Sequence, residues 1–401
     1  MDIINPLLNP FYIKRTCPKC IQEFYPGDCR IVSTITHGKE LKPAPTGWQQ
    51  LVSRVMPEQI KGAYVLELAY RECPHCQYPL PANIELVDNI NIAIIGDTFS
   101  GKSHYMAALI HQIRQGLLQR ADRYARFACL TQKVEGDFIR DVLNPLFKDK
   151  ISPPLTQKVT PPLIYELIMA PSPEHPARRL NLILHDTPGE KLADQANTLQ
   201  EARYVLNADA IVFLADPMSM EEIFDVLPPF LQKKPPIVRP ALNVLNSVIT
   251  LLENYRGLGA GARLSSTPIA ITLPKSDLLK QLTTVQKPFS FLKQPVYNGS
   301  INLEDIQRVD QEVRELLEGY NQRALLAATQ KFAKVNFFAT SATGYAPDKN
   351  NVYPAVEPCR CLDPILWILY QLDVIHASPP VIVTIVGAIP CGCPCLNGDM
   401  L

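Results

Sequence analysis

The 401-residue sequence has no apolar run of membrane-spanning length, no excess of charge of one sign, and no N-terminal segment with the order of a signal peptide. Its longest apolar candidate, residues 381–390, is too short to cross a bilayer. Lys plus Arg and Asp plus Glu balance at 39 each, so the overall charge favours neither nucleic acid nor an anionic membrane as a partner. We therefore expect a soluble, cytoplasmic protein.

Cysteine is plentiful, with 11 residues, and without a secretory signal it indicates metal binding or free thiols rather than disulfides. Four cysteines form two C-x-x-C pairs with proline after the first cysteine of each: Cys17, Cys20, Cys73 and Cys76. Two such pairs are typical of a tetrahedral zinc site with four thiolate ligands, whereas a dithiol redox pair needs only one, and free surface thiols need none. Cys29 and His75 lie nearby and are expected to be bystanders.

A glycine-rich stretch follows the apolar run Ile92–Ile95 and precedes a helical pattern of apolar residues. It reads GDTFSGKS and fits G-x-x-x-x-G-K-[ST] at every fixed position: Gly96, Asp97, Thr98, Phe99, Ser100, Gly101, Lys102 and Ser103. In such a loop the glycines let backbone N–H groups approach a phosphate, the lysine neutralises the β- and γ-phosphates, and the serine hydroxyl binds Mg²⁺. The sequence therefore predicts a phosphate-binding P-loop with Lys102 in a catalytic role.

Two further motifs follow expected strands. Asp186 and Gly189 form D-x-x-G after the strand at residues 180–185; the aspartate would hold the Mg²⁺ shell and the glycine N–H would bond the γ-phosphate. Lys275 and Asp277 form K-x-D after the strand at residues 267–273. A carboxylate accepts the N1–H and N2 amine of guanine together but faces an acceptor in adenine, and the backbone N–H of Ala342, beside Ser341, would bond the guanine O6.

Strands alternating with helical patterns indicate an α/β, three-layer P-loop NTPase fold with a mostly parallel sheet and its ligand at the carboxyl edge. The expected strands are residues 163–169, 180–185, 210–215, 267–273 and 335–339 besides the strand before the P-loop. The expected organisation is an N-terminal extension (1–16), a zinc-binding ribbon-like module (17–84), the nucleotide domain (85–376), and a tail (377–401) that is disordered or loosely docked. The tail's Cys391, Cys393 and Cys395 leave a second metal site with Cys359 and Cys361 open.

The four motifs, GDTFSGKS, DTPG, PKSD and TSA, stand in the order of the TRAFAC-type P-loop GTPases, which residues 90–376 resemble. With the cysteine pairs and the late helix LDPILWILYQL, the chain also looks like the prokaryotic double-GTPase group. The resemblance implies GTP and Mg²⁺ as ligands and a catalytic switch-I threonine, for which Thr160 is our choice and Thr156 the next.

Two positions depart from the family pattern. Pro274 stands where the family has Asn or Thr, so one tether between the base site and the P-loop is expected to be lost. Glu190 stands where many members carry the glutamine that orients the attacking water. A carboxylate there would repel the γ-phosphate, so we expect slow hydrolysis.

The leading interpretation is a GTP-binding regulatory switch with slow Mg²⁺-dependent hydrolysis and a protein partner that contacts the zinc module or the switch loops. A P-loop ATPase or kinase would share the first motif but would have no use for the K-x-D motif. A GTP-dependent scaffold without useful turnover is the third interpretation, and Glu190 is what favours it.

Overall fold

The computed structural model describes residues 13–33, 69–81, 83–154, 161–171, 176–188, 199–232, 239–256, 264, 267–282 and 289–377. At its centre is a seven-stranded sheet. Its strands are, in sheet order, β11 (Val335–Ala339), β10 (Ile269–Leu273), β9 (Ala210–Leu214), β5 (Asp88–Gly96), β8 (Arg178–Pro188), β7 (Leu163–Met169) and β6 (Ala125–Cys129).

The sheet is mostly parallel. β5 pairs in parallel with β8 and β9, and β10 pairs in parallel with β9 and β11, whereas β7 pairs antiparallel with both β8 and β6. This confirms the α/β fold predicted from the sequence. The edge strand β6 was not expected, because its sequence ARFAC alternates only partly between buried and exposed positions.

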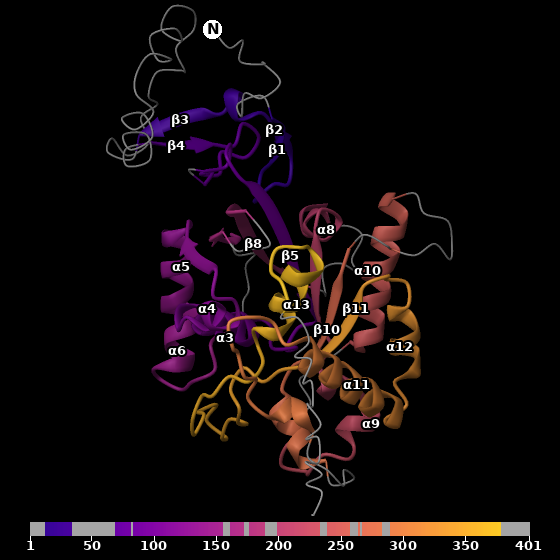
Figure 1. The fold of residues 1–401 in the computed structure, drawn as a ribbon. Coiled ribbons are helices and arrows are strands. Elements are labelled where there is room, and N and C mark those ends of the chain that lie inside the picture. The colour runs from indigo at the N-terminus through magenta and orange to yellow at the C-terminus, as the bar shows by residue number, and fades with distance from the viewer. Residues whose placement is uncertain are drawn as a thin grey trace, which may run out of the picture.

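Helices cover both faces of the sheet (Figure 1), and the alternation along β5 sets the two cores. Ile92 and Ile94 point into a core shared with α3 and α13, while Ala93 and Ile95 point into a core shared with α8, α10 and α12. The helices are α3 (Lys102–Arg114), α4 (Leu117–Ala121), α5 (Gln132–Phe138), α6 (Asn144–Phe147), α8 (Leu199–Leu206), α9 (Glu221–Phe224), α10 (Ala241–Arg256), α11 (Leu303–Gly319), α12 (Arg323–Thr329) and α13 (Asp363–Gln371). α3 ends at Arg114, and Gly116 at φ 74° separates it from α4.

The cysteine-containing part of the chain packs beside the N-terminal end of β5 (Figure 1). Its described strands form two short antiparallel pairs: β1 (Arg15–Thr16) with β2 (Glu23–Phe24), and β3 (Arg30–Ser33) with β4 (Ala69–Glu72). The Arg15 guanidinium lies 2.8 Å from the Asp88 carboxylate and donates to the Glu85 carbonyl. These contacts fix the module against the first strand of the sheet.

Buried amides fix the connection between the module and the sheet. The Asn83 amide donates to Glu166 on β7 (2.8 Å) and to Asn181 on β8 (3.0 Å), and Asn181 donates back to Asn83. Satisfied polar networks of this kind specify one arrangement, because a shifted register would leave buried donors unpaired. The module is therefore held by specific contacts and not only by its covalent link.

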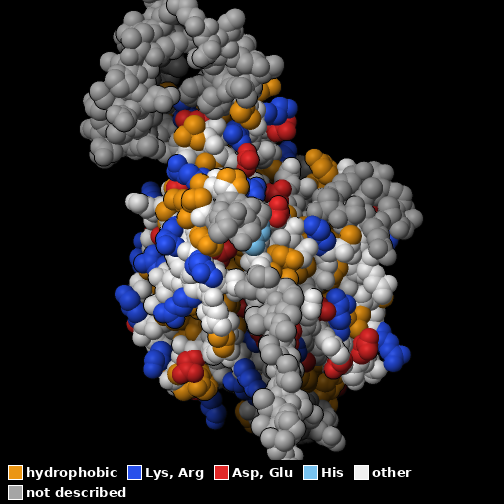
Figure 2. All heavy atoms as spheres, in the orientation of Figure 1, with side chains coloured by type: hydrophobic (Ala, Val, Ile, Leu, Met, Phe, Trp, Pro, Cys, Tyr) orange, Lys and Arg blue, Asp and Glu red, His pale blue; other side chains and the backbone are white. Residues whose placement is uncertain are grey.

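Basic, acidic and hydrophobic side chains are all present on the face shown in Figure 2, in keeping with the balanced charge of the whole sequence. Within the described residues, no helix is both long enough and apolar enough to cross a membrane.

Candidate functional site

The glycine-rich loop joins the end of β5 to α3 and has the backbone shape its sequence predicts. Gly101 caps α3 in the left-handed region at φ 86°, and Phe99 also has a positive φ of 65°. A Cβ on Gly96 would lie 2.5 Å from the Ser100 Oγ and 3.0 Å from the Leu214 Cβ, so no larger residue fits there without rearrangement. The loop thus turns tightly around the N-terminus of α3, where the helix dipole favours an anion.

The Lys102 side chain folds back over this loop. Its ammonium donates to the Gly96 carbonyl at 2.6 Å and to the Asp97 carbonyl at 3.1 Å. These carbonyls hold the charge inside the loop, where a phosphate would meet it. Ser103 follows in the first turn of α3, the position expected for a Mg²⁺ ligand.

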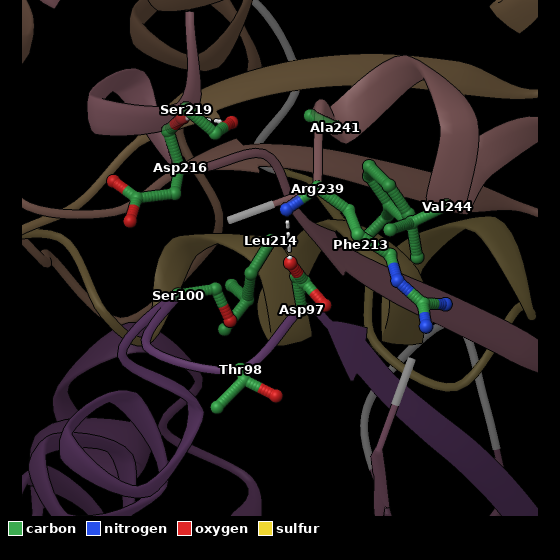
Figure 3. Close-up of a pocket in the computed structure, with 10 residues that line it drawn as sticks. All are labelled: Asp97, Thr98, Ser100, Phe213, Leu214, Asp216, Ser219, Arg239, Ala241 and Val244. Carbon is green, nitrogen blue, oxygen red and sulfur yellow. Dashed lines mark hydrogen bonds between the residues drawn. The ribbon is translucent and has the colours of Figure 1, made fainter. Parts of the chain in front are cut away.

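A small pocket lies behind the loop, between the end of β9 and the start of α10 (Figure 3). The Asp97 carboxylate accepts a 2.7 Å hydrogen bond from the backbone nitrogen of Arg239. About 240 Å³ of empty space, part of it open to solvent, is lined by Asp97, Thr98, Ser100, Phe213, Leu214, Asp216, Ser219, Arg239, Ala241 and Val244. The lining includes three residues of the glycine-rich loop, Asp97, Thr98 and Ser100, but neither Lys102 nor Asp277.

Lys275 joins the K-x-D motif to the glycine-rich loop. It has a positive φ of 57°, and its ammonium donates to the Phe99 carbonyl at 2.9 Å and to the Asp216 carboxylate at 2.6 Å. The structure therefore contains a tether between the two motifs, although Pro274 removes the one that the family pattern would supply. Asp216 was not among the sequence-based candidates. Its position directly after β9, at the same edge as the other motifs, was the available signal.

The Asp277 carboxylate accepts a 2.5 Å hydrogen bond from the Ser341 hydroxyl, which itself accepts one from the Gly344 backbone N–H at 2.7 Å. Burial raises the pKa of Asp277, and the Ser341 hydrogen bond opposes that rise. Ser341 is in turn fixed by reciprocal backbone hydrogen bonds with Cys359. The structure therefore brings together Asp277 and Ser341, two residues that the sequence places 64 positions apart.

The register of β8 places Asp186 beside Ile94 of β5, two residues before Gly96. Asp186 therefore lies at the same sheet edge as the glycine-rich loop. Gly189, Glu190, Thr160 and Thr156 lie outside the described residues, as do Cys391, Cys393 and Cys395 of the tail.

A second unexpected contact involves Tyr353. Its buried hydroxyl lies 3.2 Å from His104 Nε2 and 2.9 Å from the Ser152 hydroxyl. Burial, with a smaller contribution from the Lys275 charge, lowers the pKa of His104 to about 4, so the ring is neutral near pH 7. The Tyr353 hydroxyl thus connects His104, at the start of α3, with Ser152. No sequence motif pointed to Tyr353.

The four cysteines of the two C-x-x-C pairs come together. All four sulfur atoms lie within 4.8 Å of one another, and the Cys17–Cys76 and Cys20–Cys73 sulfurs are each 3.7 Å apart. A tetrahedral zinc site with bonds of about 2.3 Å requires sulfur atoms about 3.8 Å apart, so the cluster fits this ion. Cys29 and His75 are not part of the cluster, as expected. Burial raises the pKa of Cys20 to about 11, so metal binding would release protons.

Comparison with known proteins identifies relatives of this arrangement. The sequence model of the Double-GTPase 2 family matches residues 90–343. Among curated proteins, the "Putative ESX-1 scaffolding and assembly protein SaeC" of Mycolicibacterium smegmatis is 26% identical over 321 residues, covering 74% of this chain and 78% of that protein.

Two solved structures are also similar. The GTPase-like domain of S. cerevisiae Ski7, bound to GTP, is 14% identical, with a TM-score of 0.29. The match covers 72% of this chain and 51% of the Ski7 chain. Sup35 complexed with GDP is 13% identical, with a TM-score of 0.25. The match covers 64% of this chain and 38% of the Sup35 chain. The chain thus spans about half, or less, of these proteins.

Proposed function

The chain belongs to the Double-GTPase 2 family, and from that premise we propose that it binds Mg²⁺·GTP at the loop formed by residues 96–103. The observation that carries the proposal is the contact between the base motif and the phosphate motif. Lys275 donates to the Phe99 carbonyl of the glycine-rich loop while Asp277, two residues on, is oriented by Ser341. A purine whose phosphates lie in the loop would therefore meet a fixed carboxylate.

Each residue has a chemical role in this proposal. Lys102 exchanges its two carbonyl partners for the β- and γ-phosphates, since both are acceptors and phosphate carries the greater charge. Ser103 and Asp186 would hold Mg²⁺, a hard cation that prefers oxygen ligands. The Lys275 stem covers the base, Asp277 accepts from the guanine N1–H and N2 amine, and the Ala342 N–H meets O6.

We further propose that hydrolysis is slow and that GTP acts as a switch. Thr160, Gly189 and Glu190 would respond to the γ-phosphate, and the Glu190 carboxylate would disfavour water activation beside it. GTP occupancy would then last long enough for a partner to distinguish it from GDP.

A scaffolding role is the second candidate. It is supported by the name of SaeC, a putative scaffolding and assembly protein, and by a match that covers 74% of this chain and 78% of SaeC. In this version GTP stabilises one arrangement of the chain, the cysteine module contributes to a protein contact, and turnover is incidental.

Titration of the purified protein with GTP and ATP at fixed Mg²⁺ tests the binding proposal. We expect GTP to bind at least tenfold more tightly than ATP, because Asp277 would face an acceptor at the adenine N1. Equal affinities would contradict the base assignment and leave a P-loop ATPase or kinase. Single-turnover hydrolysis of bound GTP then separates the switch from the scaffold, since the scaffold needs no cleavage.

We also propose that the cysteine cluster holds one structural zinc ion. A closed site of four thiolates would supply folding energy to a module whose described strands are only two to four residues long. Elemental analysis of freshly purified protein tests this directly.

A further inference from the structure

One tyrosine links the cysteine cluster to the strand that carries Asp186. The Tyr204 hydroxyl, on α8, donates a 2.7 Å hydrogen bond to the carbonyl of Lys19. Lys19 lies between Cys17 and Cys20 in the first cysteine pair. Tyr204 is 3% exposed, so water does not compete freely for this bond.

The ring of the same tyrosine contacts the residue directly before Asp186. Tyr204 stacks on His185 with ring centroids 4.4 Å apart and an interplanar angle of 25°. His185 is also held by Asn91 of β5, whose Oδ1 lies 3.3 Å from its Nε2. Burial lowers the pKa of His185 to about 3, so the stack is between two neutral rings near pH 7. The ring stack therefore joins α8 to β8 beside Asp186.

Apolar packing makes a second connection between the same two places. Cys17 and Cys73 belong to a buried cluster that includes Ile164 of β7 and Ile183 of β8. Ile183 is three residues before Asp186, on the same strand. A shift of the end of β8 would therefore disturb both the Tyr204 contact and the packing under the cysteines, because close-packed interiors transmit small displacements.

We propose that Tyr204 is a positioning residue that couples metal occupancy of the four cysteines to the nucleotide state at Asp186. The proposal rests on the proposed binding of Mg²⁺·GTP. GTP with Mg²⁺ fixes Asp186 and its strand, His185 and Tyr204 carry that constraint to Lys19, and the first cysteine pair opens less often. By thermodynamic reciprocity, the metal at the cysteines strengthens GTP binding by the same factor.

The experiment measures the rate at which a chelating dye extracts zinc from the full-length protein. The protein is saturated either with Mg²⁺ and a non-hydrolysable GTP analogue or with Mg²⁺·GDP. We expect extraction to be slower with the GTP analogue by on the order of fivefold, the lower end of the range for coupled sites. In Tyr204→Phe, which keeps the ring stack and removes only the hydroxyl, the two rates should become equal.

Tyr297→Phe is the matched control. It also removes a tyrosine hydroxyl bond, here to Asp363, but Tyr297 packs against a different buried cluster from the one that holds Cys17 and Cys73, so this variant should keep the full difference between the two rates. Equal rates in wild type, or an undiminished difference in Tyr204→Phe, would overturn the coupling.

Two measurements keep the result interpretable. A separate GTP titration distinguishes failure of the link from failure of the proposed function: GTP binding with equal zinc extraction rates overturns only the link, whereas no GTP binding overturns both. Should Tyr204→Phe fail to fold, the reciprocal experiment on wild type decides. GTP affinity relative to GDP affinity should fall when zinc is removed, and an unchanged ratio contradicts the proposal.

Discussion

The Lys275 ammonium lies 2.6 Å from the Asp216 carboxylate and also donates to the Phe99 carbonyl of the glycine-rich loop. Asp216 is buried, with 7% of its side chain exposed, whereas 32% of the Lys275 side chain is exposed, so the pair is partly shielded from solvent and salt. Its other oxygen accepts from the Met218 N–H, which fixes the carboxylate in place. The pair therefore holds the Lys275 side chain against the glycine-rich loop.

Replacing Asp216 with asparagine tests this relationship. Asp216→Asn keeps the size and one oxygen for the Met218 N–H, but places an amide NH2 where the second carboxylate oxygen accepts from Lys275, so that hydrogen bond is lost. We expect GTP affinity to fall about fivefold, from the loss of one hydrogen bond worth about 1 kcal/mol, with ATP binding scarcely changed. Asp209→Asn is the control, because that carboxylate bonds the Asn91 backbone N–H and not the lysine. An affinity loss equal in both variants would argue against a base-site role.

The phosphate assignment is tested at Lys102. Lys102→Ala should lower the affinity for Mg²⁺·GTP and Mg²⁺·GDP by at least a hundredfold, because a charged partner of the phosphates is lost while no core contact is. The thermal unfolding midpoint without nucleotide should stay within a few degrees of wild type. Lys133→Ala, on the exposed side of α5, should change neither quantity. Unchanged nucleotide affinity in Lys102→Ala would remove the P-loop assignment.

Much of the sheet and of the site followed from the sequence because buried parallel strands carry continuous apolar runs and their motif residues meet at one edge. The strand at Leu163–Met169 and the strand at Val335–Ala339 have the predicted bounds, and the pairing of Asp277 with Ser341 agrees with their motifs. Membership of the double-GTPase group, which the motifs together with the cysteine pairs and the late helix predicted, is also confirmed.

The features that were missed depend on tertiary contacts and have no sequence period. Asp216 contacts Lys275, and Tyr353 contacts His104 and Ser152, through hydrogen bonds between residues far apart in the sequence. The edge strand β6 was missed because a strand covered on one side only needs little apolar sequence, and its pairing with β7 determines it.

The cysteine cluster predicts a specific response to mutation. Cys73→Ser should remove the single zinc ion and expose residues 13–81 to protease, since a closed four-thiolate site that loses one ligand loses folding energy. Cys29→Ser should keep the zinc, because Cys29 is buried in the same module but lies outside the cluster. Elemental analysis and limited proteolysis of both variants provide the measurement. Zinc retained in Cys73→Ser, or lost equally in both variants, would contradict the assignment.

His185 predicts how stability changes with pH. Its folded pKa of about 3 lies below the unfolded value of about 6.5, so between these values the unfolded chain binds a proton that the folded chain does not. Stability therefore falls as the pH is lowered through about 6.5, by roughly 1–2 kcal/mol between about pH 7 and pH 5 from this group. His185→Phe keeps an aromatic ring against Tyr204. Its stability should fall by roughly 1–2 kcal/mol less than that of the wild type between about pH 7 and pH 5. Urea unfolding at the two pH values measures it, and an unchanged difference would assign the pH dependence to other groups.

Asp277 decides whether the nucleotide is GTP, so its substitution is the sharpest test of the base site. Asp277→Asn keeps an oxygen that can accept from the Ser341 hydroxyl, but places an amide donor against the donors of guanine. GTP binding should weaken by about 1.5–3 kcal/mol, the range for a hydrogen bond to a charged group. Xanthine nucleotides should bind better than in wild type, because their C2 carbonyl accepts where guanine donates, and ATP binding should scarcely change.

Acidity provides an independent check on the same carboxylate. Because burial raises the pKa of Asp277, its charge is lost at a higher pH than for an exposed aspartate. GTP affinity of the wild type should fall as the pH is lowered toward this raised pKa, whereas the affinity of Asp277→Asn should not follow that part of the profile. Titrations of both proteins with GTP, XTP and ATP at fixed Mg²⁺, at about pH 7.5 and about pH 5.5, give all of these comparisons. If Asp277→Asn loses no GTP affinity and gains none for XTP, Lys275 and Asp277 do not read the base, and the chain is a P-loop nucleotide-binding protein of another specificity.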